Sequence, residues 1–129
     1  MGLCPIQRAV SVVSGDVARL PIQIQEYTDG RWEECEEYPE LDDILNQHTN
    51  KFFTSHEWRR WMVTNMMVWG NSFSLVSRVA GEIDELIPVR PWDIQILPDA
   101  EKGGWYYRSG EYGDLDPRDV LHWRMPAHQ

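Results

Sequence analysis

The sequence predicts an α+β fold, in which antiparallel β-hairpins and sheet strands pack with about three α-helices. Some stretches repeat apolar residues every three or four positions, as on one face of a helix, and others alternate apolar and polar residues, as in a half-exposed strand. Tight turns at Asp29-Gly30 and Ala80-Gly81 join alternating stretches, and turns this short connect antiparallel strands. We therefore expect a single domain over residues 1–129.

The first helix is expected to run from Pro5 to Leu20. Its apolar residues have the spacing of one helical stripe, at Ile6, Val10, Val13, Val17 and Leu20. Gly15 weakens such a helix by about 1 kcal/mol relative to alanine, and Pro21 ends it because the residue before a proline avoids the α region. An alternating stretch over residues 21–27, the turn at Asp29-Gly30 and a return over residues 31–33 then predict a hairpin.

Two more helices are expected in the middle of the chain. A short one spans Pro39–Gln47, and a longer one begins after Thr54, where Thr54 and Glu57 have the spacing of a capping box. Apolar and polar residues of the longer helix recur at steps of three and four up to Gly70, at Trp58, Trp61, Met62, Asn65, Met66 and Trp69. This is more Trp and Met than one helix side needs, so we expect part of it to be exposed and available to a subunit interface.

The second half of the chain predicts mainly strands. Residues 72–79 and 82–88 alternate on either side of Ala80-Gly81, which predicts a second hairpin. Residues 92–97 and 105–107 predict two shorter strands, separated by a loop with Pro98 and Gly103-Gly104. A turn over residues 115–119 precedes a last strand over residues 120–124.

Composition excludes several classes of protein. Hydrophobic residues make up 42% of the chain, which is too many for a disordered protein. The net charge is −9, and the twelve Lys and Arg are scattered, with Arg59-Arg60 the one adjacent pair, so no basic groove for duplex DNA is expected. The longest apolar run, Met66–Trp69, is far shorter than the roughly 20 residues that span a bilayer, and we expect no membrane contact.

The densest charge in the chain is acidic. Between Trp32 and Asn50 there are several Glu and Asp and no basic residue. Such a block is most often a solvated loop, because adjacent like charges repel, and the alternative is an acidic surface that meets a partner.

No catalytic, cofactor or metal site is predicted. His48, His56, His122 and His128 lack the spacing of a metal site, and no phosphate-binding loop or nucleophile elbow occurs. Asp119 and His122 suggest a base with its orienting acid, but a separation of three along a strand puts two side chains on opposite faces. Cys4 and Cys35 have no zinc or disulfide pattern, so we expect reduced thiols.

Short segments with defined residues occur in a fixed order along the chain. They are Leu20-Pro21 at the end of the first helix, Tyr38-Pro39-Glu40-Leu41, Thr54-Ser55-His56-Glu57-Trp58, Trp69-Gly70-Asn71-Ser72-Phe73, Leu86-Ile87-Pro88-Val89-Arg90-Pro91 and Asp119-Val120-Leu121-His122-Trp123. In order and spacing they resemble the N-terminal part of the portal proteins of long-tailed double-stranded-DNA bacteriophages. The resemblance covers most of the chain. It implies a structural family motif at Leu20, Pro21, Trp58, Gly70, Asn71, Pro88, Asp119 and His122.

The resemblance also implies a function, which is structural and not enzymatic. Portal subunits form a ring, usually of about twelve copies, at one capsid vertex, where it serves head assembly, DNA packaging and ejection, and head-tail joining. The expected partners are other portal subunits, terminase, capsid or scaffolding protein and a tail adaptor, while DNA passes without being held tightly. The expected locations are the virion and, during assembly, the host cytoplasm.

The resemblance further implies that residues 1–129 are a wing-like N-terminal fragment of a longer subunit, without its stem and clip. The alternative is a stand-alone α+β protein-binding module, such as a phage adaptor or an assembly factor. A hydrolase that uses Asp119 and His122 is the third candidate.

Overall fold

The computed structural model describes residues 5–126, so the predictions for Cys4 and His128 lie outside the described residues. The described elements confirm the α+β class with antiparallel strands. In chain order they are α1 (Pro5–Ala18), β1 (Gln25–Thr28), β2 (Arg31–Glu34), α2 (Pro39–Asn46), α3 (Ser55–Trp69), β3 (Asn71–Val79), β4 (Glu82–Val89), the 3₁₀ turn η1 (Pro91–Asp93), β5 (Ile94–Pro98), β6 (Trp105–Ser109), β7 (Gly113–Leu115), the 3₁₀ turn η2 (Pro117–Asp119) and β8 (Val120–Arg124).

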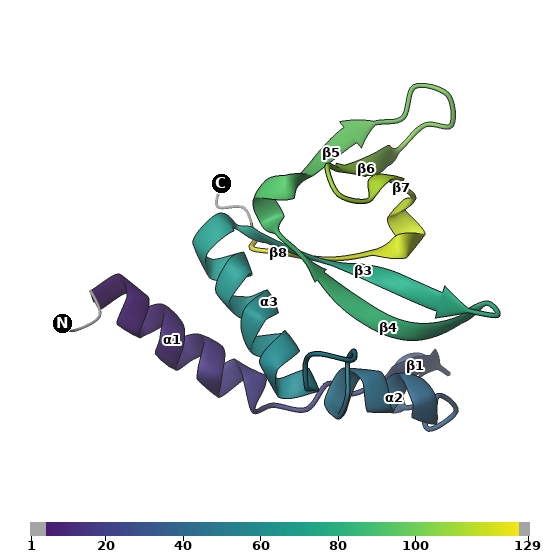
Figure 1. Ribbon diagram of the computed structural model, residues 1–129. Helices are drawn as coiled ribbons and strands as arrows, with labels where there is room; N and C mark the ends of the chain where they lie inside the picture. Colours follow the sequence, from purple (N-terminus) through teal and green to yellow (C-terminus); the bar gives the residue numbers. More distant parts are fainter. Residues whose placement is uncertain (1–4, 127–129) are drawn as a thin grey trace.

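The described strands form three groups. The hairpin β1–β2 stands beside α2, a first sheet has the order β4-β3-β8, and a second has the order β5-β6-β7. Helix α3 lies between α1 and the first sheet, and the second sheet stands over the other side of the first (Figure 1). Every strand pair is antiparallel. The sequence missed β7, and the predicted strand over residues 92–97 begins only at Ile94, because Trp92 and Asp93 belong to η1.

Helix α1 is where predicted, but its predicted apolar stripe is not its buried face. Ser14 and Ala18 are fully buried, whereas Val13, Val17 and Leu20 are exposed. Helix α1 packs on α3, and small side chains let two helix axes approach closely. The helix therefore buries its small residues and leaves its larger apolar residues to solvent.

The connection after α1 is held by a side chain. The Asn46 Oδ1 atom accepts the backbone N–H of Ile22 at 2.8 Å, and the Asn46 Nδ2 atom donates to the Ile22 carbonyl at 2.7 Å. The backbone N–H and carbonyl of Ile22 are thus bonded by the Asn46 side-chain amide instead of by a neighbouring strand. Strand β1 begins only at Gln25, later than predicted.

Both ends of α3 follow their predicted signals. The Thr54 Oγ1 atom accepts the backbone N–H of Glu57 at 3.2 Å, which is one half of the predicted capping box. At the other end Gly70 has φ +80°, the left-handed conformation that glycine adopts without a Cβ penalty. The chain then turns directly into β3.

The core lies on both faces of the first sheet. On the helix side Trp58 and Met62 are fully buried, and the Trp58 Nε1 atom donates to the Ser74 Oγ atom at 2.9 Å. The hydroxyls of Ser72 and Ser74 in turn contact the Met62 sulfur at 3.0 and 3.1 Å. Toward the second sheet the buried cluster consists of Phe73, Val89, Ile94, Tyr107 and Val120.

The loop after α2 closes the outer edge of β4 at Leu86. The backbone N–H of Leu86 donates to the Thr49 carbonyl at 3.2 Å, and the Asn50 Nδ2 atom donates to the Leu86 carbonyl at 3.0 Å. Pro88 lies two residues farther along the strand, so its nitrogen points to the same outer edge and β4 loses no bond to β3.

Arg59 connects the three helices. Its side chain is buried, with 8% exposed, although its neighbour Arg60 is exposed. The Arg59 Nε atom donates to the Ala18 carbonyl at the end of α1 at 3.0 Å, and Nη1 donates to the Leu45 carbonyl near the end of α2 at 2.9 Å. Carbonyls at helix ends carry partial negative charge and lack intrahelical partners, so they suit a buried cation. Burial lowers the pKa of the Arg59 guanidinium.

We expect Arg59→Met to lower the free energy of unfolding by about 3 kcal/mol, because it leaves two buried carbonyls without a charged donor. Arg59→Lys should recover only part of this loss, since an ammonium cannot reproduce the planar fork. Urea unfolding of both variants gives the measurement. The matched control is Arg60→Met at the adjacent exposed residue, and equal losses at Arg59 and Arg60 would contradict the role given to Arg59.

Candidate functional site

The residues of the predicted family motif fall into separate places in the fold. Asn71 and His122 meet at the junction of α3 with the first sheet. Trp58 lies on the helix side of that sheet, and Pro88 lies opposite Ser74, the residue that bonds the Trp58 indole. Leu20 and Pro21 are exposed after α1, and Asp119 belongs to η2. The motif therefore marks junctions between elements and not one cleft.

The junction at Gly70 and Asn71 is the most connected of these places. The Gly70 carbonyl accepts the backbone N–H of Met125 at 3.0 Å, which ties the end of β8 to the end of α3. Beside it the Asn71 Oδ1 atom lies 2.7 Å from His122 Nε2. The other ring nitrogen of His122, Nδ1, lies 3.2 Å from the Tyr107 hydroxyl on β6. One imidazole thus joins the two three-stranded sheets.

The surroundings of His122 favour the neutral ring. Phe73 stacks on it with ring centroids 4.5 Å apart, and Tyr107 meets it edge to face. Burial, followed by the positive charge of Arg124, lowers the pKa of His122. A neutral ring that donates from Nε2 to Asn71 and accepts at Nδ1 from Tyr107 satisfies both contacts. Because both nitrogens are engaged, the arrangement suits a structural role and not proton transfer to a substrate.

Asp119 has a different partner. Its carboxylate pairs with the Arg78 guanidinium on β3, and Arg78 Nη2 also donates to the Arg118 carbonyl at 2.8 Å. This clamp holds η2 against β3. Asp119 makes no hydrogen bond to His122. The structure therefore does not assemble the pair of histidine base and orienting carboxylate that a hydrolase would need.

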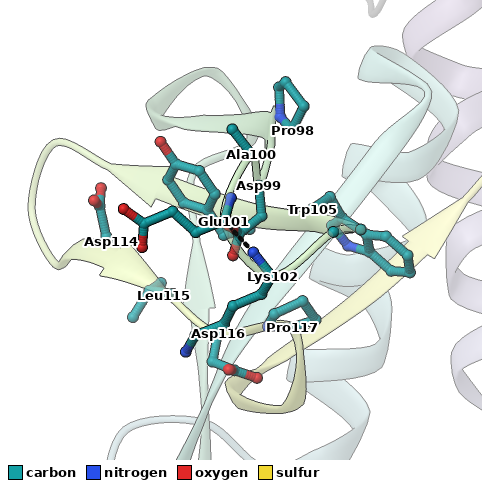
Figure 2. A pocket seen from close by; sticks show the side chains of 13 residues that line it. Pro98, Asp99, Ala100, Glu101, Lys102, Trp105, Asp114, Leu115, Asp116 and Pro117 are labelled. Carbon is teal, nitrogen blue, oxygen red and sulfur yellow. Dashed lines mark hydrogen bonds between the residues drawn. The ribbon is translucent and has the colours of Figure 1, made fainter.

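A hollow on the second sheet is lined by both polar and apolar residues. It measures about 810 Å³ and is formed by the loop after β5 together with residues around β7 (Figure 2). Three of its four carboxylates have partners: Asp99 accepts the backbone N–H groups of Glu101 and Lys102, Asp114 pairs with Arg108, and Asp116 accepts the backbone N–H of Arg118. These groups shape turns, and they do not form a free pair of acid and base.

The part of the chain that the structure describes offers little for other chemistry. Within residues 5–126 no group of three or more His, Cys, Asp or Glu side chains is arranged to hold a metal ion. No helix among the same residues is long and apolar enough to cross a membrane. Cys35 is a free thiol.

Some residues of the junction were not identified from the sequence. Tyr107 lies on a predicted strand, but its contact with His122 depends on how the two sheets pack. The buried hydroxyls of Ser72 and Ser74 occupy the polar positions of an alternating strand, which sequence patterns assign to the solvent side. Buried Met and Trp partners on α3 explain why these positions hold serine.

We expect His122→Gln to remove one acid-sensitive component of stability. The folded pKa of His122 lies below its unfolded value of about 6.5, so its contribution is complete above that pH and is lost as the pH falls through the folded pKa. Urea unfolding at several pH values below about 6.5 should show a flatter decline in the variant. His56→Gln, at an exposed position of α3, should change stability at neutral pH by less than about 0.5 kcal/mol. An unchanged acid slope in His122→Gln would contradict this role.

The sequence and the fold of this chain are similar to those of known proteins. Among curated sequences, the portal protein of Enterobacteria phage HK97 is 28% identical over 121 residues, which cover 91% of this chain and 28% of the phage protein. The chain therefore spans less than a third of the length of that relative.

Solved structures show the same fold. A chain in the neck of an empty gene transfer agent (GTA) particle has a TM-score of 0.70 and 20% identity, over 96% of this chain and 34% of the other. A chain in the virion of a native GTA particle has a TM-score of 0.63 and 20% identity, over 95% of this chain and 32% of the other. The family model described as phage portal protein matches residues 5–129, and on this match the chain belongs to the phage portal protein family.

Proposed function

We propose that this chain is a structural part of a portal ring at a capsid vertex, which serves DNA packaging and ejection and head-tail joining. The observation that carries the proposal is the family match over residues 5–129. The two similar structures support it, because one belongs to a particle neck and the other to a virion. The phage relative is a portal protein more than three times as long as the matched segment.

Within such a subunit, residues 1–129 would form the wing-like N-terminal part, and the channel-lining stem and clip would belong to other segments. The structure supports this division in one respect: the described residues pack around their own core on both faces of the first sheet. Other portal subunits, terminase, capsid or scaffolding protein and a tail adaptor are the proposed partners. The proposed locations are the virion and the host cytoplasm during assembly.

The site chemistry supports a mechanical role and not an enzymatic one. His122 is engaged at both ring nitrogens, and Asp119 is held by Arg78. In the hollow on the second sheet, Asp99 and Asp116 bond to their own turns and Asp114 pairs with Arg108. We accordingly expect no hydrolase or nuclease turnover, with or without divalent cations.

Ring formation tests the proposal. A longer polypeptide that carries this chain at its N-terminus should sediment as a closed ring, while residues 1–129 alone should be monomeric or weakly self-associating. Stable interfaces bury about 1,200–2,000 Å² in total, and a short segment retains only part of such a surface. Analytical ultracentrifugation with electron microscopy gives the readout. A monomeric longer polypeptide would count against the portal ring, and a stable ring of residues 1–129 alone would count against the proposed division.

Weak affinity for DNA is a second expectation, since DNA has to slide through a portal. The net charge is −9, Arg59 is buried, and Arg78 and Arg108 are paired with carboxylates. Fluorescence anisotropy with a labelled duplex at physiological salt should show no binding tighter than about 100 µM, the weak end of non-specific binding. Micromolar affinity that falls steeply with added salt would reveal a basic face.

A further inference from the structure

The hairpin β1–β2 has a surface that no other part of residues 5–126 covers. All eight residues of the two strands are exposed. Tyr27 and Trp32 lie opposite each other with ring centroids 5.3 Å apart, and they remain 60% and 65% exposed. A two-stranded hairpin is marginally stable in water by itself, so an uncovered aromatic pair on it is a natural contact surface.

The hairpin is also acidic. The carboxylates of Glu26 and Glu34 make no ion pair or hydrogen bond with another described residue, while the Glu33 carboxylate pairs with Arg31. Glu36 and Glu37 follow within a few residues, and both are exposed. A surface that combines two aromatic rings with unpaired carboxylates suits an apolar groove that contains a cation.

A groove with this character opens between the two three-stranded sheets. It measures about 590 Å³ and is lined by Ile96, Trp105 and Tyr107 from the second sheet and by His122 and Arg124 from β8. Ile96 and Trp105 are 48% and 52% exposed, so the walls present apolar surface to solvent. Arg124 is exposed, and its guanidinium makes no ion pair or hydrogen bond with any other residue from 5 to 126.

The hairpin and the groove belong to different parts of the molecule. Strand β1 stands beside α2, at the end of the first sheet, whereas β5 and β6 stand over its far side (Figure 1). Two complementary surfaces at different places on one subunit produce a head-to-tail contact, which closes into a ring when the rotation between copies allows it.

We propose that the β1–β2 hairpin of one copy docks into the groove between the sheets of a second copy. Tyr27 and Trp32 pack against Ile96 and Trp105, and a hairpin carboxylate pairs with Arg124. Aromatic anchors in a desolvated groove commonly supply most of the energy of an interface. The inference rests on the proposed ring, for which it names a contact between neighbouring subunits.

Complementary variants of the chain test this docking. One variant, Trp32→Ser with Tyr27→Ser, disables the hairpin, and the other, Arg124→Glu with Ile96→Asp, disables the groove. In sedimentation, the wild-type chain should associate weakly, one of the two outcomes expected of residues 1–129 alone, so that dimers and longer species appear only as its concentration is raised. Each variant alone should associate on the order of tenfold more weakly. An equimolar mixture should stop at a heterodimer, because each pair keeps one intact hairpin and one intact groove.

Matched controls separate docking from general surface effects. Trp92→Ser replaces a tryptophan that is 62% exposed, close to the exposure of Trp32, and Arg90→Glu reverses another exposed arginine. Both controls should associate like the wild type, and circular dichroism of all variants should match the wild-type spectrum.

The outcomes distinguish this inference from the proposed function. A wild-type chain that stays monomeric up to its solubility limit, or variants that associate like the wild type, would overturn the docking. A longer polypeptide that still forms its ring with Trp32→Ser and Arg124→Glu would also overturn the docking and leave the portal ring standing. A longer polypeptide that forms no ring in its wild-type form would instead count against the portal ring.

Discussion

The arrangement of the helices depends on one buried cation. The Arg59 guanidinium reaches the carbonyl ends of α1 and α2 from α3, and it meets no carboxylate among the described residues. Its charge is balanced by the partial charges of backbone groups that would otherwise lack donors. Asn46 extends this network to the chain after α1, since its side chain bonds both Arg59 and Ile22. Helix α3, fixed in this way, then presents Trp58 and Met62 to the first sheet.

Local signals in the sequence were sufficient to predict most of the helices and strands. Thr54 and Gly70 act on backbone groups within a few residues, so the ends of α3 followed from spacing and conformational preference alone. The hairpin turns at Gly30 and Gly81 are similarly local. Features that depend on contact between distant segments, such as which face of a helix is buried, were not predictable in the same way. The buried face of α1 is set by its approach to α3, and for this reason Ser14 is buried while Val13 is not.

The same distinction applies to the candidate site. The sequence indicated Asn71 and His122 through a family resemblance, and the structure supplies the physical link, a hydrogen bond across neighbouring strands. Tyr107 could not be found from local patterns, because its partner is decided by how the second sheet lies on the first. In the sequence Arg59 is only one half of the adjacent pair Arg59-Arg60, and the convergence of two helix ends explains its burial. Asn71 and His122 of the predicted motif thus lie at a contact between elements.

The closed edge of β4 has a consequence for how copies of this protein can meet. A free strand edge invites pairing with other chains, and this is a common route to aggregation in proteins that are crowded together. Thr49 and Asn50 occupy the hydrogen-bonding groups of Leu86, and Pro88 has no N–H to offer a neighbouring strand. Edge-to-edge pairing of sheets through this stretch of β4 is thereby disfavoured. A second copy that approaches here meets side chains, whose contacts can be selective where backbone pairing is not.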